Sequence, residues 1–246
     1  MESSGGWRIA KRKKGRRSRK RTTVPLEHVE PAEQGAPSED DLEKTIQWVS
    51  SARCEIQGSK MWAQFRELFS EVVLNRGLAT PFDCTVIYGL GGLSSFVSRY
   101  QLGLVLELRD WLALGRIETF DPIFTERDKL VMQRLGVDVL GSNERGARVA
   151  KAPTLVYMAH CEADLHENLI SANRQANSLH NLVMIGNDLY KYKELFDGGP
   201  KPQYPEPVTL LELCHQGRVI SHPLEELDLM DTRAFNDTSL QIFRTS

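Results

Sequence analysis

The sequence predicts an α/β fold in which a mostly parallel sheet carries helices on both faces. From residue 82 onward, short apolar runs alternate with helical patterns of about ten to twenty residues, which is typical of parallel strands joined by crossover helices. The run VIYGLGGLSS places a strand, a glycine-rich turn and the start of a helix in the order that opens such a domain. The 246 residues are 41% apolar, which is enough for one buried core. We therefore expect a Rossmann-like three-layer sandwich, preceded by N-terminal helices and a disordered basic arm.

The disordered arm and its linker are expected to span residues 1–37. The stretch KRKKGRRSRKR, Lys11 to Arg21, has self-repelling charge and no apolar periodicity, so it cannot offset the entropy cost of becoming ordered. It is read either as a nuclear-localisation signal or nucleic-acid contact, or as a solvated tail without a specific role.

The charge of the chain is unevenly distributed. Residues Arg8 to Arg21 include 10 Lys or Arg and no acid, so the remainder from Thr22 carries a net charge of about −11. Nucleic-acid affinity depends on cations that neutralise phosphates. Nucleic acid is therefore expected to be contacted only by the basic arm, and other proteins are the expected partners of the domain.

The chain is expected to be cytoplasmic, and also nuclear if the basic arm acts as an import signal. No run reaches the roughly 18 uninterrupted apolar residues that span a bilayer, and the N-terminus lacks the apolar core of a signal peptide. No membrane association is expected. The four cysteines occur singly without a C-x-x-C pair, which is typical of reduced thiols in a cytosolic or nuclear protein.

Two helices are expected between residues 38 and 77. Ser38, with Asp41 three residues later, resembles a capping box at the start of the first helix. The second helix is expected from Ser59 to about Arg76, with Gly77 as its C-terminal cap. Its wide apolar stripe predicts packing against the core and consists of Trp62, Phe65, Leu68, Phe69, Val72 and Val73.

The Rossmann-like core is expected over residues 82–246. Its periodicity predicts strands at 84–90, 116–122, 137–140, 154–160 and 181–187, and helices at 94–114, 126–136 and 165–179. The polar stretch GSNERGARVA, 141–150, separates the third and fourth strands.

The glycine-rich turn is the first candidate ligand site. Such turns let backbone amides and a helix N-terminus approach a phosphate or a cofactor carboxylate. The fingerprint G-x-G-x-x-G is incomplete, because Ser94 stands at the position of its last glycine, so the glycines are read either as a ligand cradle or as a tight strand-to-helix turn. Asp121, or alternatively Glu118, would hold a ribose from the next strand end. The candidate binding residues here are Gly89, Gly91, Gly92, Ser94 and Asp121.

A second cluster, HCEADLH, follows the strand TLVYMAH. His160 could contact a ligand or handle a proton, or could be a hydrogen-bonded structural residue. His160 and His166 lie six residues apart, which would place them on opposite sides of one helix, so no metal site is predicted. After the next strand, Asn187 and Asp188 would either cap a helix or line the same crevice, and Asn187 is included as a candidate.

Several stretches together resemble one known family. In chain order they are YGLGGLSSFVSRYQL, FDPIFTERDKLVMQRLG, GSNERGARVA, PTLVYMAHCEADLHENLISAN, IGNDLYKY and AFNDTSLQIFR. They are similar to the SRR-like domain, which takes its name from sensitivity to red light reduced, over roughly residues 40–246. The basic arm and the length resemble the animal SRR domain-containing proteins. This chain has Ala159 where the family has proline before the His-Cys pair.

The resemblance implies a regulatory protein, associated with circadian-clock gene expression and with the regulation of haem biosynthesis. No established reaction comes with this family, so no catalytic residue is carried over, and a non-enzymatic role is favoured. The recurrent family positions that match this chain are Gly89, Gly91, Ser98, Arg99, Tyr100, Gln101, Asp121, Pro122, Asn143, His160, Cys161, Gly186 and Asn187.

Two hypotheses follow. The first is a regulator whose domain makes protein contacts, and the second is an enzyme, methyltransferase-like or nucleotide-binding, with its ligand at the GLGG turn. The cofactor is undetermined between a nucleotide-type ligand and haem, since Cys161 and the histidines offer ligands without an evident axial pair. The enzyme hypothesis expects Gly91, Asp121, His160 and Asn187 to meet in one open crevice. The regulator hypothesis expects them to be scattered, with the space around them filled by side chains.

Overall fold

The computed structural model of the chain describes residues 36–75, 81–198, 205–224 and 232–244. The residues from Ala36 onward form one compact unit. The predicted disorder of the basic arm and the predicted cap at Gly77 concern residues outside these ranges.

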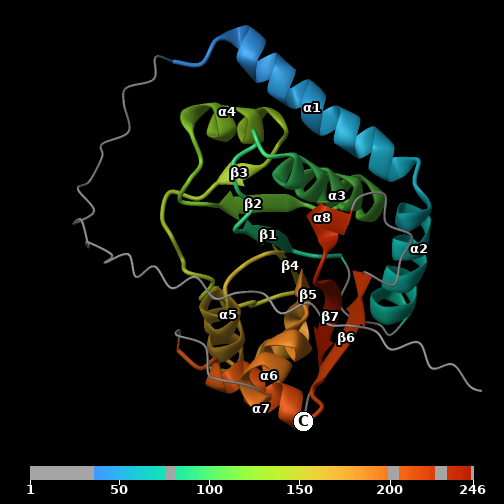
Figure 1. The fold of residues 1–246 in the computed structure, drawn as a ribbon, viewed down its shortest axis with the longest axis vertical. Helices are drawn as coiled ribbons and strands as arrows, with labels where there is room; N and C mark the ends of the chain where they lie inside the picture. Colours follow the sequence, from blue (N-terminus) through green and yellow to red (C-terminus); the bar gives the residue numbers. More distant parts are fainter. Residues whose placement is uncertain (1–35, 76–80, 199–204, 225–231, 245–246) are drawn as a thin grey trace, which may run out of the picture. The chain divides into compact units, whose positions relative to one another are not determined.

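The fold is built on a seven-stranded sheet with the order β3-β2-β1-β4-β5-β7-β6 (Figure 1). Neighbouring strands from β3 to β5 are parallel, whereas β7 runs antiparallel to both β5 and β6. This mostly parallel sheet confirms the predicted fold class. The strands are β1 (Cys84–Tyr88), β2 (Arg116–Phe120), β3 (Asp138–Val139), β4 (Thr154–Met158), β5 (Leu182–Asn187), β6 (Val219–Pro223) and β7 (Thr238–Phe243).

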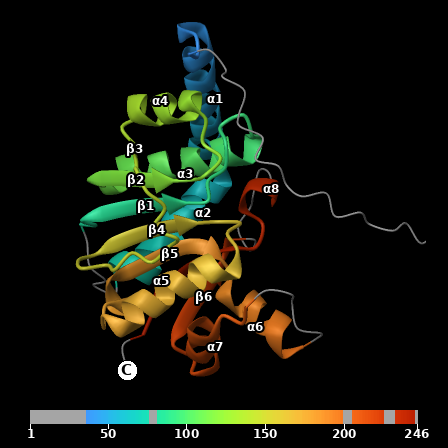
Figure 2. The same ribbon diagram turned by 90° about the vertical axis from the view of Figure 1, so that its left-hand side faces the viewer.

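Helices cover both faces of the sheet, and each face has its own apolar core. Figures 1 and 2 show the helices that precede β3 on one side, together with the short helix α8 (Thr232–Phe235), and the helices between β4 and β6 on the other. The first face carries α1 (Glu39–Gln57), α2 (Lys60–Phe69), the π-helix η1 (Ser70–Leu74), α3 (Phe96–Leu112) and α4 (Glu126–Arg134). The second carries α5 (Ala163–Gln175), α6 (Leu189–Asp197) and α7 (Val208–His215). The short elements are η2 (Leu179–Asn181) and α8 (Thr232–Phe235).

The N-terminal helices begin where the sequence predicts. The Ser38 hydroxyl accepts the amide of Asp41, and the Ser59 hydroxyl accepts that of Trp62, so each serine caps its helix. The helices α1 and α3 cross closely at Gly103, where an added Cβ would lie 3.2 Å from the Ile56 side chain. A larger residue at position 103 would therefore push α1 away from the core.

Some predicted boundaries are wrong, and the backbone shows why. The second helix is not one α-helix to Arg76, since it changes at Ser70 into a π-helix. The strand predicted over 84–90 ends at Tyr88, because Gly89 has φ +66 and leaves the extended conformation. The strand predicted over 154–160 ends at Met158, and His160 has φ +57. The elements after residue 187, from α6 to β7, were not predicted from the sequence.

In the described part of the chain, no helix has the length and apolarity needed to cross a membrane. All four cysteines are unpaired.

Candidate functional site

The glycine-rich loop between β1 and α3 is held by two carboxylates of the chain. The amide of Gly91 donates to Asp121 Oδ2 at 2.8 Å, and the amide of Ile123 donates to Oδ1 of the same carboxylate at 3.0 Å. Asp121 follows β2, the neighbour of β1, so the adjacent strand ends bring loop and carboxylate together. Each carboxylate oxygen of Asp121 thus accepts a backbone amide.

Asp128 is the second carboxylate, and it is not among the site residues predicted from the sequence. Asp128 is only 1% exposed, and its Oδ1 accepts the amide of Leu93 at 3.1 Å. Its Oδ2 accepts the amide and hydroxyl of Thr125, and the Thr125 hydroxyl accepts the Asp128 amide, which completes a capping box at the start of α4. The signal in the sequence is the spacing T-x-x-D at the start of a helical pattern. The same carboxylate therefore begins α4 and fixes the loop.

The space beside the loop glycines is filled by side chains. A Cβ on Gly89 would lie 2.5 Å from Cys161 Sγ, and a Cβ on Gly91, whose φ is +78, would lie 2.8 Å from Ser98 Oγ. Both positions need glycine, for conformation and for close approach. Gly92 is half-buried, an added Cβ there would lie no closer than 3.5 Å to its neighbours, and Ser94 is exposed.

Cys161 is a buried free thiol. Its Sγ donates to the carbonyl of Tyr88 at 3.4 Å, and burial raises the pKa of the thiol to about 12. Because the thiolate is the form that binds metals and attacks electrophiles, this environment disfavours both roles at neutral pH. The amide of Cys161 donates to Asn187 Oδ1 at 3.2 Å, so Asn187 secures the turn after β4.

His160 connects the turn after β4 to the segment before β7. The Gln101 Nε2 atom lies 3.2 Å from His160 Nδ1 and also donates to the Ala234 carbonyl at 3.0 Å. An amide nitrogen can only donate, so His160 Nδ1 accepts, and Nε2 carries the proton that it shares with the Asn236 carbonyl at 3.3 Å. The ring is exposed, but both nitrogens have partners within the chain.

His166 is separated from His160 in environment and in role. It is fully buried in α5, its Nδ1 donates to the Glu162 carbonyl at 3.0 Å, and burial lowers its pKa to about 4. Asp188 is an N-cap, since it accepts the amide of Tyr190 at 3.1 Å. Two hypotheses were given for Asn187 and Asp188. Asp188 caps a helix, whereas Asn187 lies at the strand ends with Cys161.

Glu118, the alternative acid, points away from the loop into a charged network. It is 2% exposed and forms ion pairs with Arg148 and Arg116. Arg148 also holds Glu144 through two contacts of 2.7 and 2.9 Å, and Glu144 accepts the Tyr88 hydroxyl. Burial and the neighbouring Glu144 raise the pKa of Tyr88 well above its ordinary value. The polar stretch 141–150 therefore supplies Arg148, one of the two ion-pair partners of a buried acid on β2.

Among the described residues, no three His, Cys, Asp or Glu side chains are placed to hold a metal ion.

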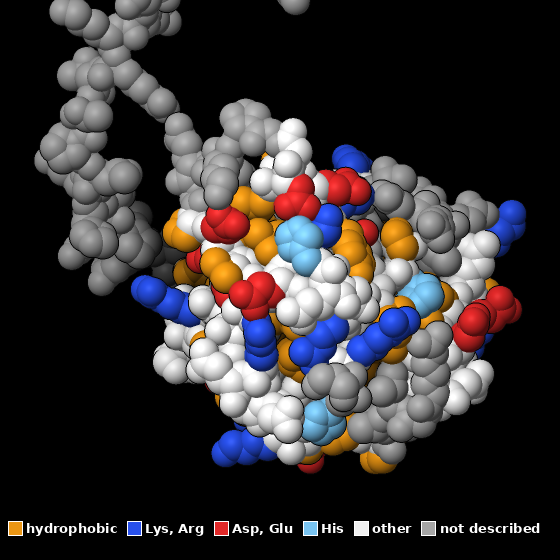
Figure 3. Space-filling model, turned by 90° about the horizontal axis from the view of Figure 1, so that it is seen from below, with side chains coloured by type: hydrophobic (Ala, Val, Ile, Leu, Met, Phe, Trp, Pro, Cys, Tyr) orange, Lys and Arg blue, Asp and Glu red, His pale blue; other side chains and the backbone are white. Residues whose placement is uncertain are grey.

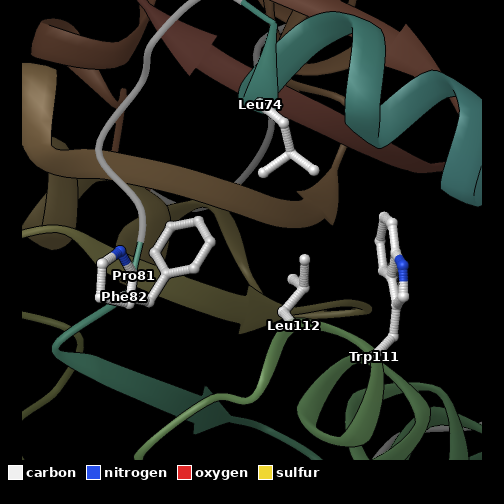
Figure 4. A pocket seen from close by; sticks show the side chains of 5 residues that line it. All are labelled: Leu74, Pro81, Phe82, Trp111 and Leu112. Carbon is white, nitrogen blue, oxygen red and sulfur yellow. The ribbon is translucent and has the colours of Figure 1, made fainter.

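A cavity lies at the opposite end of β1, away from all the candidate residues. Its volume is about 350 Å³, and Figure 4 shows its apolar lining: Leu74, Pro81, Phe82, Trp111 and Leu112. Leu74 ends η1, and Phe82 lies two residues before β1. The face of the molecule in Figure 3 presents basic and acidic side chains close to one another, as expected for a domain of mixed charge.

The family model of the SRR1 domain matches residues 64–242. The protein SENSITIVITY TO RED LIGHT REDUCED 1 of Arabidopsis thaliana is 32% identical over 209 residues, covering 78% of this chain and 75% of the relative. An SRR1-like protein of Mus musculus is 36% identical over 113 residues, 44% of this chain and 45% of the relative. One of Drosophila melanogaster is 27% identical over 168 residues, 68% of this chain and 57% of the relative.

One solved structure that this chain matches is the plantazolicin methyltransferase BpumL in complex with a triazolic desmethylPZN analog and SAH. Its TM-score is 0.35 at 12% identity, and the match covers 75% of this chain and 78% of that one. A structure of the same enzyme with SAH alone matches with a TM-score of 0.31 at 12% identity, over 76% of this chain and 74% of that one.

Proposed function

This chain belongs to the SRR1 domain family, and we propose that it is a regulatory protein that acts through contacts with other proteins and not through catalysis. The processes proposed are those that the family resemblance implies, circadian-clock gene expression and haem biosynthesis. The name of the Arabidopsis relative, which refers to red-light sensitivity, supports a role in signalling. We further propose that the protein is cytoplasmic, with a nuclear pool that depends on the basic arm from Lys11 to Arg21.

The proposal rests on the way the loop amides are held. A nucleotide phosphate or an S-adenosylmethionine carboxylate would need amide donors from a glycine-rich turn of this kind. Here the amides of Gly91 and Leu93 already donate to Asp121 and Asp128. An anionic ligand would have to displace a carboxylate and then lie beside it, which like charges disfavour. The loop is therefore best explained as a rigid strand-to-helix connection.

The second candidate is a methyltransferase-like or nucleotide-binding enzyme. One observation favours it: Asp121 lies at the end of β2, where related sheets hold a ribose, beside two glycines with positive φ. For a ribose to bind, Asp121 would have to release the amides of Gly91 and Ile123. The two candidates therefore make opposite predictions for Asp121→Asn.

The test uses thermal melts and calorimetry of the full chain with S-adenosylmethionine, ATP, NAD and haem. We expect no ligand to raise the melting temperature, because only a ligand selective for the folded state does so. Asp121→Asn should lower the stability of the ligand-free protein by about 1.5–3 kcal/mol, since an Asn oxygen can accept only one of the two amides and its NH₂ group would face the other.

The matched control is Asp164→Asn, which changes an exposed acid in the first turn of α5 and should have little effect. The regulatory proposal is contradicted if a ligand raises the melting temperature of the wild type and Asp121→Asn abolishes that increase while leaving the ligand-free stability unchanged. In cells that lack the protein, an unaltered clock-gene reporter and unaltered haem content would contradict the proposed processes.

A further inference from the structure

The apolar cavity near the start of β1 is built from three separate parts of the chain. Leu74 ends η1, Pro81 and Phe82 precede β1, and Trp111 and Leu112 end α3. In Figure 4, Leu74 and Leu112 point toward each other across the cavity, and the rings of Phe82 and Trp111 stand on its other two sides. We call this space, with its five lining residues, the Trp111 cavity.

The two rings of the cavity are held from behind by one buried residue. Phe69 is fully buried and meets Trp111 edge-on at a centroid distance of 5.7 Å and Phe82 at 6.3 Å. Trp111 also meets the Trp62 ring edge-on at 5.8 Å. Edge-to-face pairs at these distances are favourable. The positions of both rings are therefore fixed by the core, so a ligand between them needs little reordering of the protein.

A third wall of the cavity comes from a rare kind of helix. The element η1 is a π-helix, and the Asn75 amide donates to the Ser70 carbonyl at 2.8 Å across its turn. Turns of this kind are uncommon and are frequent at functional sites. Val72 and Val73 of the same turn are buried in the core, whereas Leu74 lines the cavity. The π-helix thus joins the core to the cavity wall.

The lining and the size of the cavity select the class of ligand. All five lining side chains are apolar, and burying a charge without a partner is costly. An apolar cavity of about 150 Å³ binds benzene. The Trp111 cavity, at about 350 Å³, lies near the lower limit of small-molecule pockets, which range over about 300–1,000 Å³. We propose that it binds an uncharged, planar, apolar molecule about the size of naphthalene, in contact with the Phe82 and Trp111 rings.

This site is independent of the glycine-rich loop, and the inference goes beyond the proposed protein contacts. Phe82 lies before β1 and Gly89 follows it, so the cavity and the loop are at opposite ends of the strand. S-adenosylmethionine, ATP and NAD carry charges that the apolar lining does not pair. Melts with these cofactors therefore do not test the cavity.

The alternative occupant is a segment of the chain itself. Residues 76–80 connect Asn75 to Pro81 and lie outside the described ranges, and their sequence RGLAT has one large apolar residue, Leu78. The test has to distinguish a ligand from this side chain.

The test titrates prodan, an uncharged naphthalene dye whose emission moves to shorter wavelength in apolar surroundings, into the full chain. We expect saturable binding, a blue-shifted emission and a higher melting temperature. Leu74→Trp should weaken binding about ten-fold or more, because the added ring fills the cavity. Leu112→Trp should do the same from the opposite wall. Trp111→Leu should weaken binding about two- to ten-fold through the loss of one ring contact.

The matched control is Leu195→Trp, which adds the same bulk to an exposed leucine of α6, on the other face of the sheet. Melting temperatures show whether each variant is folded. Leu74 and Leu112 are half-buried beside open space, so their tryptophan variants should melt close to wild type. Asp121→Asn should bind prodan as wild type does.

The proposal is overturned if prodan shows no saturable binding, or if Leu195→Trp weakens binding as much as Leu74→Trp. Binding that appears only in Leu78→Ser would also overturn it, because the chain itself would then cover the cavity. Loss of binding in Asp121→Asn would place the probe at the glycine-rich loop and reject the cavity. A stabilising cofactor in the melts described above would refute the non-enzymatic role and leave this cavity standing.

Discussion

The contact between Gly89 and Cys161 allows a quantitative test of how tightly the loop is packed. In Gly89→Ala, the new Cβ would lie 2.5 Å from Cys161 Sγ, well inside the roughly 3.5–4.0 Å of ordinary contact. The φ of +66 costs an L-residue about 1–2 kcal/mol, and overpacking adds about 1–3 kcal/mol. We expect Gly89→Ala to lower the free energy of unfolding by about 2–5 kcal/mol.

A second substitution separates the two costs. Cys161→Ala removes Sγ, so in the double variant the clash disappears and only the conformational cost of about 1–2 kcal/mol persists. The two substitutions should therefore be less than additive, with a coupling of about 1–3 kcal/mol. Gly217→Ala is the matched control, because Gly217 has φ +64 but nothing lies within 4 Å of an added Cβ.

The measurement is urea unfolding of the full chain, followed by tryptophan fluorescence, for wild type, the single variants and the double variant. If the effects of Gly89→Ala and Cys161→Ala add to within about 0.5 kcal/mol, Sγ does not occupy the space beside Gly89 and the packing argument is wrong. A cost for Gly217→Ala as large as that for Gly89→Ala would also refute it, because conformation alone would then explain both.

Two further predictions concern pH and localisation. Burial lowers the pKa of His166 from 6.5 to about 4, so the unfolded chain binds a proton first as the pH falls. The stabilisation that comes from keeping His166 neutral is therefore complete above about pH 6.5. Between pH 6.5 and 4 it is lost, and the free energy of unfolding falls by up to about 1.4 kcal/mol per pH unit. Urea unfolding at several pH values should show a smaller slope for His166→Gln, and an unchanged slope would contradict the prediction. Replacing the basic residues of Lys11 to Arg21 with glutamine should reduce nuclear accumulation without changing the melting temperature, and an unchanged nuclear fraction would exclude the import signal.

The fold class could be predicted because the signals for the central strands are local. Apolar runs such as CTVIY and TLVYM are buried on both faces of the sheet, and the helices between them keep one apolar stripe. The π-helix at Ser70–Leu74 could not be predicted, since its sequence SEVVL fits an ordinary α-helical stripe. The end of β4 was also predicted wrongly, because a positive φ at His160 cannot be predicted from its residue type.

The candidate residues show a different limit of sequence reasoning. Gly89, Gly91, Asp121, His160 and Asn187 all lie at the carboxyl ends of strands, as their positions in the pattern required. Most of their partners could not be identified from the sequence, because they are distant in the chain and depend on side-chain rotamers. Asn187, for example, is 26 residues from the amide of Cys161 that it accepts.

The two proposed functions make different demands on Asp121, because one carboxylate cannot meet both at once. A ribose-binding acid has to present its oxygens to two hydroxyl groups. In this chain, both oxygens accept amides, and one of those amides belongs to Gly91, in the turn that would cradle the phosphate or carboxylate of the same ligand. Ligand binding would therefore have to break the contact that holds its own binding loop in place. The glycines and the acid stand at the strand ends where a nucleotide-binding pattern has them, although the pattern is incomplete at Ser94, and in the structure these residues are one another's partners.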